Sequence, residues 1–204
     1  QVMKAFIKTY WKTLLFFAVI GLVGGFFTGI YVLDSYPAEL RQQLLEELKA
    51  ADLGQLPANR IMGVITAVQS AGYGLILGAA GIFLGKKTGL WKDETSLTKK
   101  PLLTALVISV VGGMVLILPD ILFFGKHVQA IMDSYAVKPT VPYLIATVTY
   151  GAVIEEVMLR LFMMSLIAFL LQKVFGKKTW ILVVSNFLAA LLFAAGHLPI
   201  TFMT

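Results

Sequence analysis

The chain has 204 residues, of which 58% are hydrophobic and 14% are charged, and its mean hydropathy is +0.85. A soluble domain carries charge on roughly a quarter of its residues, so the composition excludes an ordinary soluble protein and indicates an integral membrane protein. The net charge of +6 does not indicate nucleic-acid binding, because the basic residues lie in short segments between apolar runs, without interleaved stacking aromatics.

The chain contains no cysteine. Disulfides and thiolate metal ligands are therefore excluded, and a metal would need histidine and carboxylate ligands.

Five apolar stretches reach the length of about 20 residues that a membrane-crossing helix needs. We expect helices at about residues 14–33, 61–84, 102–124, 142–172 and 179–197. These stretches predict an all-α protein, a polytopic transmembrane helical bundle with at least five membrane helices in a single domain over residues 1–204. The first stretch follows three lysines, as in a signal peptide, but it is longer than a typical signal-peptide core and is expected to be retained.

The segment after the first stretch, residues 38–53 (AELRQQLLEELKAADL), follows Pro37 and has apolar residues near helical spacing. This pattern predicts a short amphipathic helix at the membrane surface. A solvated connector is the alternative.

The distribution of lysine and arginine predicts the orientation. Three lysines precede the first stretch, five lie in residues 85–101 and three in residues 173–178, against five basic residues in the segments of the opposite side. Because cytoplasmic segments are enriched in basic residues, we expect a multi-pass protein of the cell membrane, in contact with membrane lipid, with its amino terminus in the cytoplasm.

The fourth stretch carries three ionisable residues, Glu155, Glu156 and Arg160, although each such group costs roughly 2.5 kcal/mol or more in a bilayer core. On a helix, Arg160 lies one turn after Glu156 and is expected to pair with it. Glu155 points about 100° away and keeps no local partner, which suits a general base or acid. The alternative is an ion pair that only holds two helices together. Such a pair does not need a second adjacent glutamate, so the second glutamate favours a catalytic role.

The fourth stretch is also longer than a span of about 30 Å requires. We expect it to break at Gly151, four residues before Glu155, and to open a wet cavity beside the carboxylates.

His197 is the second candidate for chemistry. Asn186, Phe193 and His197 fall on one face of the last expected helix, where Asn186 and Phe193 would support the site. Glu155 and His197 are similarly far along the chain from the basic turn at residues 173–178, so their side chains are expected at the same depth. Together they could hold one water or one metal. A histidine at a helix end, with no role in chemistry, is the alternative.

Glu155-Glu156-x-x-x-Arg160, followed one helix later by Phe193-x-x-x-His197, resembles the motifs of the CPBP (Abi) intramembrane proteases. That family includes the type II CAAX prenyl endopeptidases and many bacterial relatives, and the resemblance covers about residues 142–200. It implies that Glu155 activates the water that attacks a peptide bond, that His197 assists, and that Glu156 and Arg160 orient and stabilise the site. The chain is therefore expected to be an intramembrane endopeptidase that acts on a membrane-associated peptide or protein.

The family resemblance leaves the cofactor open. A divalent metal such as zinc would be held by Glu155 and His197, whereas a metal-free mechanism would use the same two side chains alone. The family has a further motif, His-x-x-x-Asn on a later helix, that nothing in the chain matches. We expect this motif after Thr204 in a longer protein; otherwise the chain is a relative without protease activity.

Two other classes of function compete with the protease. The first is a non-catalytic CPBP-like membrane scaffold or immunity protein, in which the charged cluster is a structural remnant. The second is an ion-coupled transporter, which would also place carboxylates in the membrane but would show repeated halves, and the sequence has no internal repeat.

Overall fold

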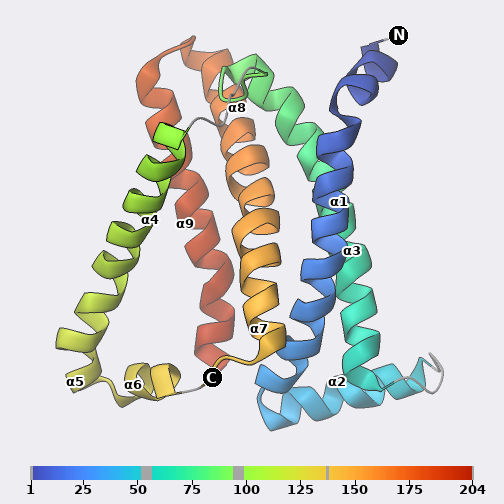
Figure 1. Ribbon diagram of the computed structural model, residues 1–204, viewed down its shortest axis with the longest axis vertical. Coiled ribbons are helices and arrows are strands. Elements are labelled where there is room, and N and C mark those ends of the chain that lie inside the picture. The colour runs from blue at the N-terminus through green and yellow to red at the C-terminus, as the bar shows by residue number, and fades with distance from the viewer. Residues whose placement is uncertain (1, 52–56, 94–98, 137, 204) are drawn as a thin grey trace. The chain divides into compact units, whose positions relative to one another are not determined.

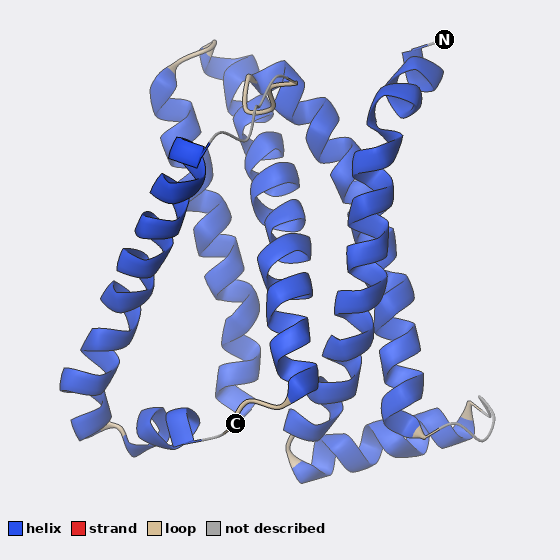
Figure 2. Cartoon of the chain, in the orientation of Figure 1, coloured by secondary structure: helices blue, strands red, loops and turns tan. Residues whose placement is uncertain are grey.

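The computed structural model describes residues 2–51, 57–93, 99–136 and 138–203, and within these ranges it contains helices and no strand (Figure 2). The expected all-α fold is confirmed. The elements are α1 (Val2–Ser35), α2 (Ala38–Ala50), α3 (Ala58–Thr88), α4 (Lys99–Pro119), η1 (Asp120–Phe124), α5 (Gly125–His127), α6 (Gln129–Ala136), α7 (Val141–Ala146), η2 (Thr147–Ile154), η3 (Val157–Met164), α8 (Ser165–Phe175) and α9 (Thr179–Met203), where η marks a π-helix.

By length and composition, four helical runs of the described chain can cross a membrane: Lys4–Leu33, Ala58–Thr88, Lys99–His127 and Thr179–His197. They coincide with four of the five expected stretches and indicate a membrane protein. The remaining stretch is helical without interruption from Val141 to Phe175, but α-helical and π-helical segments alternate along it. The expected break at Gly151 is wrong, because this residue lies inside the π-helix η2.

The chain forms two compact units, whereas the sequence predicts one domain. The first unit consists of Gln1–Trp91 and Val141–Thr204, and the second is Lys92–Thr140. We call them the core unit and the α4 unit. In the α4 unit, the Tyr135 hydroxyl donates a hydrogen bond of 2.9 Å to Asp120 Oδ2 and ties α6 to η1.

α1 and α3 lie side by side in the core unit (Figure 1). A Cβ atom at Gly21 of α1 would lie 2.6 Å from the carbonyl oxygen of Ser70, and one at Gly25 would overlap the carbonyl oxygen of Thr66. The two backbones approach this closely because the facing residues are small. The Ser70 hydroxyl, buried in the same interface, donates to the Thr66 carbonyl at 2.6 Å.

The expected amphipathic helix is present as α2, which runs across the ends of α1 and α3 in Figure 1 and contains no buried residue. Its leucines are half-buried at most, and its charged residues are exposed. Such a helix suits a membrane surface better than a protein core.

The amino-terminal half of α1, the last turn of α3 and the end of α8 meet at one end of the core unit, which we call the basic end (Figure 1). There, Lys86 Nζ donates a hydrogen bond of 2.6 Å to the Tyr10 hydroxyl, and Gln172 Nε2 of α8 donates to the Thr88 carbonyl of α3 at 3.3 Å. Gly176, with φ of 74°, turns the chain from α8 back into α9. The three lysine-bearing ends of the core unit therefore lie together, as the basic pattern predicts for segments on one side of a membrane.

Candidate active site

Glu155 and Glu156 are the two residues between the π-helices η2 and η3. We call the continuous helical run from Val141 to Phe175 the motif helix. A π-helix pairs residues five apart instead of four, and such turns occur frequently at functional sites. The two glutamates therefore lie where the helical geometry is least regular.

Two glycines of neighbouring helices contact the motif helix on either side of the glutamates. A Cβ atom at Gly24 of α1 would lie 2.7 Å from the backbone nitrogen of Tyr150, and one at Gly81 of α3 would lie 2.8 Å from the carbonyl carbon of Leu161. Tyr150 belongs to η2 and Leu161 to η3. α1 and α3 thus hold both π-helices at backbone contact distance.

The predicted ion pair is present: Arg160 Nε lies 3.0 Å from Glu156 Oε2, one helical turn away. The side chain of Arg160 is 69% exposed and that of Glu156 is 49% exposed, so the rest of the protein does not enclose the pair. Hydropathy marks the segment as apolar, but it does not show which face of the helix its neighbours cover. The pair lies on a face that they leave open.

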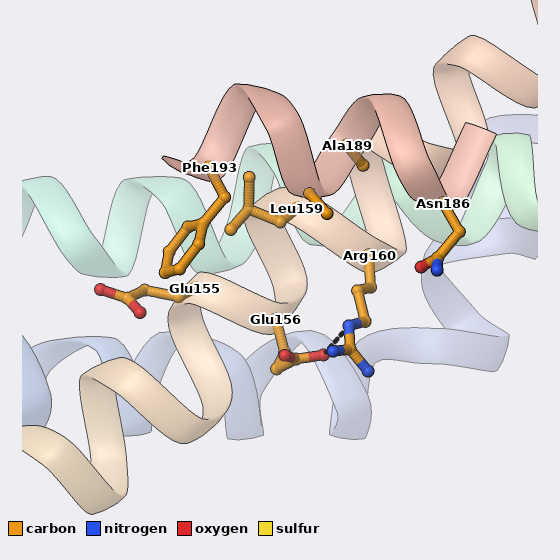
Figure 3. Close-up of a pocket in the computed structure, with 8 residues that line it drawn as sticks. Glu155, Glu156, Leu159, Arg160, Asn186, Ala189 and Phe193 are labelled. Atoms are coloured by element: carbon orange, nitrogen blue, oxygen red, sulfur yellow. Dashed lines mark ion pairs between the residues drawn. The ribbon is translucent and has the colours of Figure 1, made fainter. Parts of the chain in front are cut away.

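Glu155 has different surroundings. It is half-buried, and in Figure 3 its carboxylate points away from Arg160, past the ring of Phe193. It interacts electrostatically with Glu156 and with His197 of α9. Glu155 is thus outside the ion pair of its neighbours, as the helical geometry predicts.

A cavity of about 160 Å³ lies between the motif helix and α9 (Figure 3). Its lining comes from one face of each helix: Glu155, Glu156, Leu159 and Arg160, and opposite them Asn186, Ala189, Ala190 and Phe193. The structure therefore brings together five of the six residues that the sequence selects. Carboxylates, a guanidinium group and a carboxamide can orient a polar group such as a peptide bond, while the alanines leave room for it.

His197, the sixth residue, is exposed and is not part of the cavity lining. Its ring lies 4.2 Å from that of Phe193, centroid to centroid, and Nδ1 lies 2.9 Å from the Phe193 carbonyl oxygen. Because a carbonyl only accepts, Nδ1 is the donor in this hydrogen bond, which leaves the lone pair of a neutral ring on Nε2. This tautomer can accept a hydrogen bond from a water.

The described residues do not fit a zinc centre. They contain no group of three or more histidines, aspartates or glutamates placed to hold a metal ion. Catalytic zinc uses three protein ligands, whereas Glu155 and His197 supply two.

No protein-family model matches the chain, and neither a curated protein nor a solved structure is significantly similar to it. The resemblance to the CPBP proteases therefore rests on the spacing of the two motifs.

Sequence reasoning missed the tyrosines near Glu155. Tyr31 of α1 and Tyr150 of η2 both interact electrostatically with Glu155, and the Tyr31 ring packs edge-on against that of Tyr143 at 5.4 Å. Tyr31, near the end of the first apolar stretch, also fits an ordinary interfacial aromatic. The sequence does not show which helices are adjacent, so it cannot distinguish a tyrosine beside Glu155 from an aromatic residue at the membrane interface.

Proposed function

We propose that the chain is an intramembrane endopeptidase of the CPBP type, which hydrolyses a peptide bond of a membrane-associated substrate. The observation that carries the proposal is the arrangement around the cavity. Both motif carboxylates, Arg160 and Asn186 of α9 border one space, and Glu155 lies outside the ion pair. Phe193 lines the same space, and the ring of His197 lies 4.2 Å from the Phe193 ring, centroid to centroid.

In the proposed reaction, a water molecule binds between the Glu155 carboxylate and His197 Nε2. Glu155 takes a proton from this water as the water oxygen forms a bond to the peptide carbonyl carbon. The same proton then passes from Glu155 to the amide nitrogen as the carbon–nitrogen bond breaks. The products are a carboxylic acid and an amine, and no other reactant is consumed.

Glu156 and Arg160 have supporting roles in this proposal. One guanidinium N–H binds Glu156, and the remaining N–H groups can donate to the oxyanion that forms on the carbonyl oxygen. Glu156 holds the guanidinium in position for this contact. Asn186, on the opposite wall of the cavity, can donate to a backbone carbonyl of the substrate.

The proposal places the protein in the cell membrane as a multi-pass protein, with the basic end and the amino terminus in the cytoplasm. Since the chain has no cysteine, single-cysteine variants test the orientation. A membrane-impermeant maleimide added outside cells should label Ala50→Cys on α2 and spare Lys177→Cys in the α8–α9 turn. The reverse labelling would overturn the orientation.

A cleavage assay tests the activity. The probe is a quenched fluorescent peptide, anchored in vesicles through an S-farnesyl cysteine or, in a second version, through a transmembrane helix. Glu155→Gln should lower cleavage by roughly 10²-fold or more, the usual scale of general-base catalysis. It should not lower thermal stability, because a neutral amide is less costly to bury than a carboxylate. His197→Ala should lower cleavage as well, and Glu46→Gln on α2 is the matched control.

The exposed Glu156–Arg160 pair favours one alternative, a membrane scaffold that seats a partner on these charges. The same assay separates the two functions. Cleavage that is unchanged in Glu155→Gln would rule out the catalytic role of Glu155. If neither probe is cleaved by the unsubstituted protein, but a co-purifying partner is lost in Arg160→Ala, the scaffold is the function.

A further inference from the structure

The basic end of the core unit contains a charged cluster that the proposed active site does not use. Lys87, in the last turn of α3, and Lys173, in the last turn of α8, both direct their ammonium groups at the ring of Phe169. Their Nζ atoms lie 5.5 Å and 4.8 Å from its centroid. Lys87 Nζ also lies 4.3 Å from the centroid of Phe83. Two cations from different helices thus converge on one aromatic side chain.

Helix packing fixes this convergence. Gln172, which precedes Lys173, donates a hydrogen bond from Nε2 to the backbone carbonyl of Thr88, which follows Lys87, at 3.3 Å. The bond connects α3 to α8 at the level of the two lysines. The two backbones therefore place both lysines beside Phe169.

Neither ammonium group has a carboxylate partner in the described part of the chain. The aromatic rings attract each cation separately, but they do not remove the repulsion between the two positive charges. An anion that contacts both ammonium groups would offset this repulsion. Both lysines lie in the last turn of an apolar helix. Helix ends of this kind lie at the depth of the phosphate groups of a bilayer.

We propose that Lys87 and Lys173 bind the phosphate of an anionic phospholipid headgroup. Exposed apolar side chains beside the lysines can contact the acyl chains of the lipid. Phe83 is 45% exposed, and Leu170, one turn before the end of α8, is 54% exposed. A free inorganic phosphate would gain nothing from these apolar neighbours. The site is separate from the Glu155 cavity, and it stands whether or not the chain is a protease.

Native mass spectrometry of the full chain in detergent tests the site, with phosphatidylglycerol and phosphatidylcholine of identical acyl chains as probes. The unsubstituted protein should retain phosphatidylglycerol in preference to phosphatidylcholine. Lys87→Gln and Lys173→Gln should each lower the affinity for phosphatidylglycerol about fivefold, which corresponds to about 1 kcal/mol per lysine. The affinity for phosphatidylcholine should not change.

Two further variants control for folding and for general charge. Lys87→Arg with Lys173→Arg keeps both charges and should keep the preference for phosphatidylglycerol. Lys177→Gln with Lys178→Gln removes two charges from the neighbouring turn and should also keep it. An equal loss in this second pair would show attraction to a diffuse basic surface and would overturn the site. Displacement of the lipid by millimolar inorganic phosphate would show that the cluster binds free phosphate, and it would equally overturn the proposal.

Discussion

Two interfaces of the core unit differ in what they leave between their helices. α1 and α3 meet at backbone distance, with Gly21 and Gly25 against the carbonyl groups of Ser70 and Thr66. The motif helix and α9 meet beside a cavity of about 160 Å³, whose lining combines Glu155, Glu156, Arg160 and Asn186 with apolar side chains. The first interface excludes any ligand, whereas the second has room for a water or for part of a substrate.

The two interfaces are connected through the motif helix. One side of this helix packs against Gly24 of α1 and Gly81 of α3, and its other side forms the cavity wall. The close packing of α1 and α3 therefore fixes the position of the residues that carry the proposed chemistry. A catalytic group needs this rigidity, because a displacement of about 1 Å can lower a rate by about 100-fold.

The largest effect on stability is expected at the close interface. Gly21→Leu should destabilise the protein by about 2–3 kcal/mol, because a Cβ at this position would lie 2.6 Å from a backbone carbonyl oxygen that cannot rotate away. Unfolding of the protein in detergent, followed by circular dichroism, measures the change. Gly112→Leu on α4 is the matched control, since nothing lies within 4 Å of its Cβ position. Equal destabilisation by the two substitutions would contradict the close packing of α1 on α3.

Much of this fold follows from sequence, because hydropathy and helical periodicity depend on local residues. The apolar helices, the amphipathic α2 and the Glu156–Arg160 pair are each predicted from spacing alone. The shared face of Asn186 and Phe193 is predicted in the same way, and both residues line the cavity.

The exposure of Arg160 and the π-helices around Glu155 and Glu156 could not be predicted in this way. Exposure depends on which neighbours cover a helix face, and the fourth stretch is apolar on nearly every side. The two π-helices contact Gly24 and Gly81 through their backbones, and these glycines belong to helices that are far away in the sequence. Both features depend on tertiary packing, and a single sequence carries no direct record of it.

A smaller effect is expected from filling the cavity. Ala190→Leu adds three carbon atoms to the cavity wall and should lower peptide cleavage about tenfold, equivalent to about 1.4 kcal/mol, by displacing water or substrate. Stability should change by less than about 0.5 kcal/mol, because the residue is exposed. Val183→Leu, at a position of α9 that is 67% exposed and outside the cavity lining, should leave both quantities unchanged. An unchanged rate in Ala190→Leu would show that the reaction does not use this cavity.

Breaking the ion pair is also expected to have only a small effect on stability. Breaking a buried pair costs roughly 3–5 kcal/mol, because one charge is left unpaired in a medium of low dielectric constant. A pair that water reaches contributes only about 0–1 kcal/mol. Arg160 is 69% exposed and Glu156 is 49% exposed, and both line the cavity. We expect water in the cavity to reach the pair, so that Arg160→Ala costs less than about 1 kcal/mol in stability.

A double-mutant cycle with Arg160→Ala and Glu156→Ala measures this pair directly, with unfolding free energies determined in lipid nanodiscs. The expected coupling energy is below about 1 kcal/mol, and cleavage should fall in all three variants, since Glu156 and Arg160 position each other beside Glu155. A coupling energy of roughly 3 kcal/mol would mean that lipid or protein covers the pair in the membrane. The open face of the motif helix would then be a contact surface, and the cavity would have to be reached by the substrate from another side.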